Sequence, residues 1–124
     1  HILSSPELQS DNLESHLFVA HNYIAENQND IALIILSEAV KRFPSSHRAA
    51  FELGYFLFEL DRFEEATEYL RRSITLEPTR NPKKYFTLAE ISEPKDAVKL
   101  YETGIALYSQ KLARPELSGK LSRH

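Results

Sequence analysis

The sequence predicts an all-α fold, an α-solenoid in which antiparallel helix pairs stack side by side. Small residues and prolines recur at a fixed interval, apolar residues recur at steps of three and four, and only 3 of the 124 residues are glycine. Steps of three and four place apolar side chains on one face of a helix. A fixed interval of about 20–50 residues indicates that one structural unit is repeated.

The same interval separates four pairs of positions: Ala20 and Gly54, Ala32 and Ala66, Ala39 and Ser73, Pro44 and Pro78. At about 34 residues, it is the period of a unit that consists of two helices and a turn. Small residues allow two helices to approach closely, so we expect Ala20 and Gly54 to face Ala32 and Ala66 on the second helix of each unit. The prolines are expected to end the second helices, because proline disfavours helical geometry in the residue before it. We therefore predict two regular units, at residues 13–46 and 47–80.

The two units resemble the tetratricopeptide repeat (TPR) family. The second unit carries Leu53, Gly54, Leu57, Phe63, Ala66, Leu70, Ser73, Ile74, Leu76 and Pro78 where the family pattern expects them, with Ala50 replacing its tryptophan. The first unit carries Val19, Ala20, Tyr23, Ala32, Leu36, Ala39, Val40 and Pro44 in the same register. The resemblance implies a right-handed superhelix. It also implies that the first helix of each pair lines a concave groove that binds other polypeptides.

A third, shortened unit is expected after Pro82, which suits the first turn of a helix. Its first helix has an apolar face at Tyr85, Leu88, Ala89 and Ile91. The second helix begins at Pro94, and its apolar residues are expected on one side: Ala97, Leu100, Tyr101, Gly104, Ile105 and Tyr108. The step from Ala89 to Ala97 is shorter, by about one helical turn, than the corresponding step in the regular units, from Gly54 to Ala66. The unit is therefore either a degenerate repeat or typical of a subfamily with this shortening.

Six helices are expected in all, with no sheet. Their predicted bounds are 12–26, 30–43, 47–60, 63–76, 82–91 and 94–111. Residues 12–111 would then form the helical array. Residues 1–11 are expected to be a flexible lead-in, and residues 112–124 either a linker or the beginning of a truncated further helix.

The composition argues against several classes of function. Without cysteine the chain has no disulfide frame and no thiolate ligands, and the five histidines are not spaced to bind a metal on one helical face. A net charge of −3 argues against a nucleic-acid binder that relies on a basic face. The longest apolar run, at residues 31–36, is far shorter than a membrane span. No catalytic or cofactor motif occurs, so we expect neither an enzyme nor a bound cofactor.

The candidate binding residues are those that the repeat register places on the inner face of the first helices. They are Leu17, His21 and Ile24 in the first unit, Phe51, Glu52, Tyr55, Phe58 and Glu59 in the second, and Phe86 and Glu90 in the third. An aromatic and aliphatic stripe that faces only water would be unusual. The stripe therefore predicts a peptide-binding groove, and the alternative is that some of these residues belong to the core.

The family's carboxylate clamp for chaperone tails is not expected. It needs basic and amide side chains where this chain has Leu17, His21 and Glu52, and only Lys83 matches.

Residues 82–105 also resemble the fungal TPR family of dedicated assembly chaperones for large-subunit ribosomal protein number four. The shared positions are Pro82, Lys84, Tyr85, Phe86, Leu88, Ala89, Ser92, Ala97, Tyr101 and Gly104. This resemblance implies a monomeric chaperone of the cytoplasm and nucleus that shields a basic segment of a ribosomal protein. The alternative interpretation is a scaffold or oligomerisation module of a multiprotein complex.

Overall fold

The computed structural model describes residues 12–113, and every regular element within that range is an α-helix. The helices are α2 (Leu13–Ala25), α3 (Asn29–Arg42), α4 (His47–Glu59), α5 (Phe63–Leu76), α6 (Lys83–Glu90) and α7 (Pro94–Leu112). Each predicted boundary lies within one residue of the observed one, so the all-helical prediction is confirmed. The predictions for residues 1–11, and for the tail beyond residue 113, lie outside the described residues.

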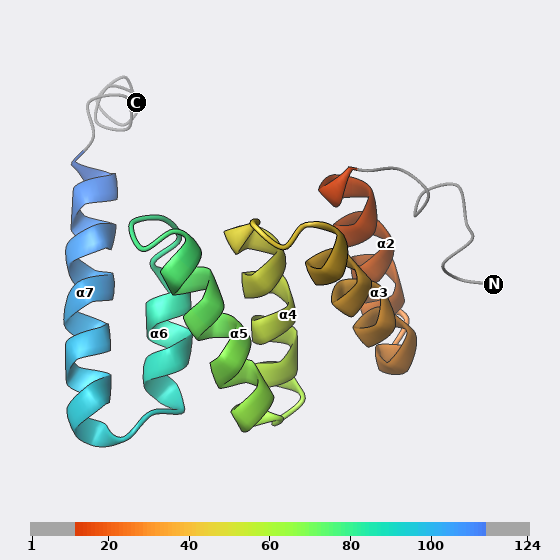
Figure 1. Cartoon of the computed structure of the whole chain (residues 1–124). Helices are drawn as coiled ribbons and strands as arrows, with labels where there is room; N and C mark the ends of the chain where they lie inside the picture. The colour runs from red at the N-terminus through yellow and green to blue at the C-terminus, as the bar shows by residue number, and fades with distance from the viewer. Residues whose placement is uncertain (1–11, 114–124) are drawn as a thin grey trace, which may run out of the picture.

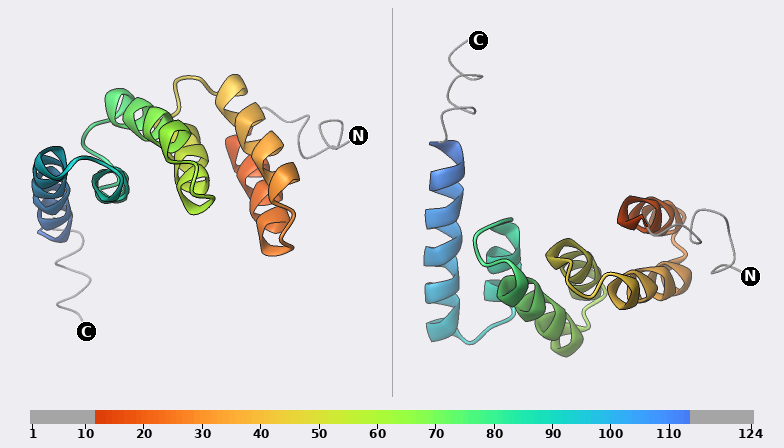
Figure 2. Two further views of the ribbon diagram at one scale, coloured as in Figure 1. Left: turned by 90° about the horizontal axis from the view of Figure 1, so that it is seen from below. Right: turned by 45° about the horizontal axis from the view of Figure 1, so that its top comes forward.

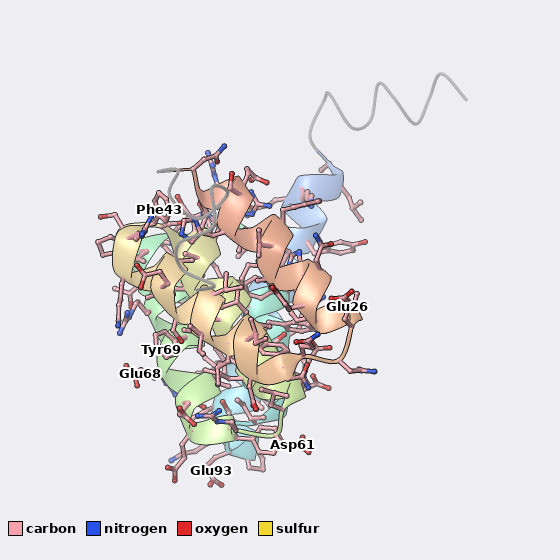
Figure 3. The ribbon with its side chains drawn as sticks, turned by 90° about the vertical axis from the view of Figure 1, so that its right-hand side faces the viewer. Glu26, Phe43, Asp61, Glu68, Tyr69 and Glu93 are labelled. Carbon is pink, nitrogen blue, oxygen red and sulfur yellow. The ribbon has the colours of Figure 1, made fainter. Side chains whose placement is uncertain are left out.

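The six helices form three antiparallel pairs, α2 with α3, α4 with α5, and α6 with α7 (Figure 1). The pairs follow one another along a curved row, which is most easily seen in Figure 2. Figure 3 shows that Glu26, Asp61 and Glu93, which mark the loops within the pairs, lie toward one end of the helices. Phe43, which follows α3, lies at the opposite end. Successive pairs contact one another through α3 and α4, and through α5 and α4 with α6, as a repeat array requires.

Side-chain caps and loop residues explain where the helices of the regular units begin and end. The side chains of Asn12 and Ser46 accept hydrogen bonds from the backbone amides of the first turns of α2 and α4, at 2.9 and 3.1 Å. Asn27 and Asp61, each in the loop within a pair, have φ angles of 60° and 62°. Asn and Asp adopt this left-handed conformation more readily than most residues. The two positions are again separated by the regular repeat interval.

The small residues that predicted the repeat are in the core. Ala20, Ala32 and Ala66 are 0% exposed. A Cβ atom added at Gly54 would lie 3.0 Å from the backbone nitrogen of Leu70 and 3.1 Å from its Cγ. The close approach at Gly54 is confirmed, but the residue that it faces most closely is Leu70, one helical turn beyond Ala66. The larger side chain fits because leucine packs over the glycine itself.

The prediction for α7 was wrong in one respect, since its apolar residues occupy two faces. Ala97, Leu100 and Gly104 are half-buried or buried on the side that packs against α6. Tyr101, Ile105 and Tyr108, expected on that same side, are exposed. Close contact with α6 needs the small residues, because a Cβ at Gly104 would lie 2.6 Å from the ring of Phe86. The large residues therefore project from the neighbouring face of the helix.

A buried lysine joins the second pair to the third. Lys84 is 0% exposed, and its Nζ donates to the carbonyl oxygens of Ser73, at 3.1 Å, and Glu77. These carbonyls lie at the end of α5. The carbonyl of Ser73 also accepts from the backbone amide of Glu77 at 3.0 Å, and the ammonium group adds a further donor that caps the helix end. Burial lowers the pKa of Lys84. Burial, with the nearby Lys84 charge, also lowers the pKa of His47, whose Nδ1 is buried without a hydrogen-bond partner among the described residues.

Candidate functional site

The first helices of the three pairs are linked by polar side chains along one side of the row. His21 on α2 lies 3.2 Å from the carboxylate of Glu52 on α4. Glu14 and Arg48, one repeat apart, form an ion pair between the same two helices. Lys83 at the beginning of α6 extends over the ring of Tyr55 on α4, with its Nζ 4.1 Å from the ring centre. These contacts fix the relative positions of side chains that the repeat register predicted on the inner face.

A cavity of about 240 Å³ lies on this side of the molecule. It is lined by His21, Ile24, Leu36, Phe51, Glu52, Tyr55, Phe56, Glu59 and Lys83. Six of the ten candidate binding residues are therefore brought together in one site, His21, Ile24, Phe51, Glu52, Tyr55 and Glu59. The apolar lining comes from α2, α3 and α4, and the polar groups come from α2, α4 and α6.

A row of aromatic rings continues along α4 from the cavity. The ring centres of Phe51 and Tyr55 are 5.7 Å apart in a stacked arrangement, and those of Tyr55 and Phe58 are 5.9 Å apart. Phe58 in turn lies 6.0 Å from Phe63 at the beginning of α5. Rings at these separations support one another's orientation. Tyr55 is consequently held in place from both sides along the helix, while Lys83 covers one face of its ring.

Two candidate residues are not exposed as expected. Leu17 is 2% exposed and belongs to the core, so its assignment to an exposed inner surface was wrong. Phe51 is 8% exposed; it is also a core residue, but it contributes to the floor of the cavity. Both side chains belong to the hydrophobic core cluster, and a register within one repeat cannot reveal how deeply other elements bury a position. The core alternative therefore holds for Leu17 and partly for Phe51.

The remaining candidates lie outside the cavity. Phe58 is half-buried beside it, in the aromatic row. Phe86 is half-buried between α6 and α7, where its ring stacks on Tyr101 at 6.3 Å. Glu90 is exposed at the end of α6. The third unit thus contributes to the site mainly through Lys83.

Lys83 was not predicted as part of the site. From the sequence, Lys83 was noted only as the one residue that matches the carboxylate clamp. The offset that aligns Ala89 with Gly54 also aligns Lys83 with Arg48, whose side chain likewise bridges two first helices. This recurrence of a basic residue at the start of successive first helices was a signal that could have identified it.

Within residues 12–113, no group of three or more histidine, aspartate and glutamate side chains could hold a metal ion. In the same range no helix is both long enough and apolar enough to cross a lipid bilayer. The cavity offers an apolar and aromatic floor, two carboxylates, the imidazole of His21 and the ammonium group of Lys83. Such a combination is suited to holding part of another molecule through contact and charge.

Comparisons with known proteins agree with the repeat architecture. A family model described as tetratricopeptide repeat matches residues 20–81, half of the chain. A crystal structure of MamA superposes with a TM-score of 0.75 at 17% identity, covering 86% of this chain and 64% of that one. A second MamA structure gives a TM-score of 0.69 at 23% identity, covering 80% of this chain and 56% of the other. The chain thus spans roughly three-fifths of the length of these proteins, and no curated protein matches it.

Proposed function

The chain belongs to the tetratricopeptide repeat family, and we propose that the cavity between its first helices binds a segment of another protein. The observation that carries this proposal is the convergence of six predicted residues around one cavity of about 240 Å³. Repeat proteins of this kind present extended surfaces on which a partner is bound by contacts from several units.

The chemistry of the cavity favours a basic segment as the ligand. Glu52 and Glu59 supply two carboxylates from α4. The face of the Tyr55 ring already holds one cation, Lys83, at a distance typical of a cation–π contact. A lysine or arginine of the partner could take that place, with its aliphatic stem against the apolar floor and its charge toward the carboxylates. Acidic groups would also increase the rate of encounter with such a segment.

The narrower proposal is that the partner is a basic segment of a ribosomal protein, which the chain shields before incorporation into the ribosome. It is supported by the resemblance of residues 82–105 to the assembly chaperones and by the acidic groups of the cavity. In that role the protein would act in the cytoplasm and the nucleus. The tyrosine, carboxylates and apolar floor would cover part of a basic chain that otherwise attracts nucleic acid.

Affinity capture from a cell extract tests this function. The folded parent chain is compared as bait with a variant carrying both Glu52→Lys and Glu59→Lys, after circular dichroism confirms that the helices are retained. We expect the parent to capture a basic protein, identified by mass spectrometry, and the variant to lose it. Equal capture by both baits would contradict binding of a basic segment at this cavity. Capture of a basic protein that is not ribosomal would contradict only the narrower proposal.

A further inference from the structure

One face of α7 is apolar and largely exposed, although Tyr101 on it also stacks on Phe86 of α6. Val98, Tyr101, Ile105, Tyr108 and Leu112 are between 39% and 58% exposed. Their spacing alternates between three and four residues, so they form one continuous stripe along the helix. The same spacing forms the seam where helices pack against one another in coiled coils. A contiguous apolar surface of this kind marks an interaction site more often than a free surface.

The repeat register indicates what kind of element covers such a face. The interval from Ala66 to Ala97 equals the interval from Ser73 to Gly104, and both are slightly shorter than the regular repeat interval. All four are small residues at the contact between the helices of a pair. This shorter offset therefore aligns α5 with α7, just as the regular interval aligns α3 with α5.

On the earlier second helices this face belongs to the core. The offsets align Tyr101 with Leu70 on α5 and Leu36 on α3, and both leucines are at most 1% exposed. Ile105 aligns with Ile74 on α5, which is half-buried, and with Val40 on α3, which is 7% exposed. Leu36, Val40 and Leu70 share one cluster with buried residues of α4. Leu70 packs on Gly54 of its own pair, whereas Leu36 lines the cavity together with Phe51 and Phe56 of α4. On α3, the first helix of the following pair therefore contributes to covering this face.

A first helix with an uncovered side is present at the other end of the described array. Phe18 on α2 is 65% exposed, the highest value among the large apolar residues between positions 12 and 113. Phe18 occupies the register position of Glu52. Glu52 faces the preceding pair, because its carboxylate contacts His21 on α2. The next residue, Val19, is half-buried, whereas its counterpart Leu53 is 1% exposed. The outward side of α2 is thus the counterpart of the surface by which α4 contacts the preceding pair.

We propose that the outward side of α2 from a second copy of the chain covers the apolar stripe of α7, so that copies associate head to tail. The stripe would then receive a first helix in the register in which α3 receives α4. Such an interface uses a different surface on each copy, and it extends into a chain of copies unless the ring closes. A two-fold pairing of α7 with α7 is disfavoured, because it would leave Phe18 exposed on both copies. The expectation of a monomer is replaced by this proposal.

Three aspartate variants test the proposal. Phe18→Asp alters only the α2 surface, Ile105→Asp alters only the α7 stripe, and Ile34→Asp is a matched control at a 52% exposed isoleucine on the outer side of α3. Mass in solution is measured by sedimentation velocity over a series from micromolar to near-millimolar concentration. We expect the mass of the parent and of the control to rise with concentration. Each of the other two variants alone should remain a monomer.

The decisive sample is an equimolar mixture of the Phe18→Asp and Ile105→Asp chains. The first retains an intact α7 stripe and the second an intact α2 surface, so the mixture should form a one-to-one dimer that does not grow further. A parent that stays monomeric throughout, a Phe18→Asp variant that associates like the parent, or a mixture without dimers would each overturn the proposal. If circular dichroism shows that either aspartate variant has lost helix, Phe18→Ser and Tyr108→Asp replace it.

Discussion

Replacing Gly54 by leucine should destabilise the fold strongly. The Cβ alone would lie 3.0 Å from the backbone nitrogen of Leu70, and that atom cannot move without shifting α5. The rest of the leucine side chain would need space that the Leu70 side chain already fills at 3.1 and 3.2 Å. Overpacking of a filled core costs about 1–3 kcal/mol or more, and the removal of glycine from a helix returns at most about 1 kcal/mol. We expect a net loss of about 2 kcal/mol, toward the upper end of the overpacking range.

For a domain of about 100 residues, a loss of this size lowers the melting temperature by roughly 8 °C or more. The control is Glu64→Ala, at an exposed residue in the first turn of α5, where we expect a change within about 0.5 kcal/mol. Thermal and urea unfolding followed by circular dichroism measure both variants. Equal shifts for the two would show that the packing of α4 on α5 at Gly54 is not as tight as the structure indicates.

Three further outcomes are expected. Glu59→Lys should weaken binding of the identified partner mainly at low ionic strength, where charges are least screened, as titration at two salt concentrations would show. Lys83→Ala should strengthen binding about two- to fivefold, because it removes the cation that competes for the Tyr55 ring, a contact worth about 0.5–1 kcal/mol; unchanged or weaker binding would contradict this. Because the pKa of His47 is lowered in the folded state, the unfolded chain binds more protons as the pH falls below about 6.5. Stability should therefore decrease below that pH, and His47→Gln should reduce the decrease in urea unfolding measured from pH 7 to 5.

The repeat and its helices could be predicted from the sequence because they depend on local and periodic signals. Ala20, Gly54 and the prolines at the repeat interval set the register of α2 to α5, while Pro82 and Pro94 located α6 and α7, in each case to within one residue. Much of the site followed as well, since inner positions of one helix remain together wherever the helix packs. Tyr55, Glu52 and Glu59 therefore converge as expected.

Depth of burial and contacts between units could not be predicted in the same way. Leu17 and Tyr55 are both inner candidates in the sequence, yet Leu17 is 2% exposed and Tyr55 is only half-buried. Lys84 is a charged residue in a polar stretch, and its burial depends on carbonyl groups that α5 offers only once the second and third pairs have packed. The two faces of α7 depend in turn on the position of Phe86 against Gly104.

The binding role of the cavity is tested most directly by comparing Tyr55→Ala with Tyr69→Ala. Tyr69, labelled in Figure 3, is also half-buried and also carries a cation, with the Arg72 guanidinium 4.7 Å from its ring centre, but it lies on α5 away from the cavity. The measurement is calorimetric titration of each folded variant with the partner identified by capture. Truncation of a buried aromatic anchor commonly costs about 2 kcal/mol, and about 1.4 kcal/mol corresponds to a factor of ten. Tyr55→Ala should therefore bind at least about tenfold more weakly while Tyr69→Ala binds like the parent, and parental affinity in Tyr55→Ala would contradict the assignment of the cavity as the binding site.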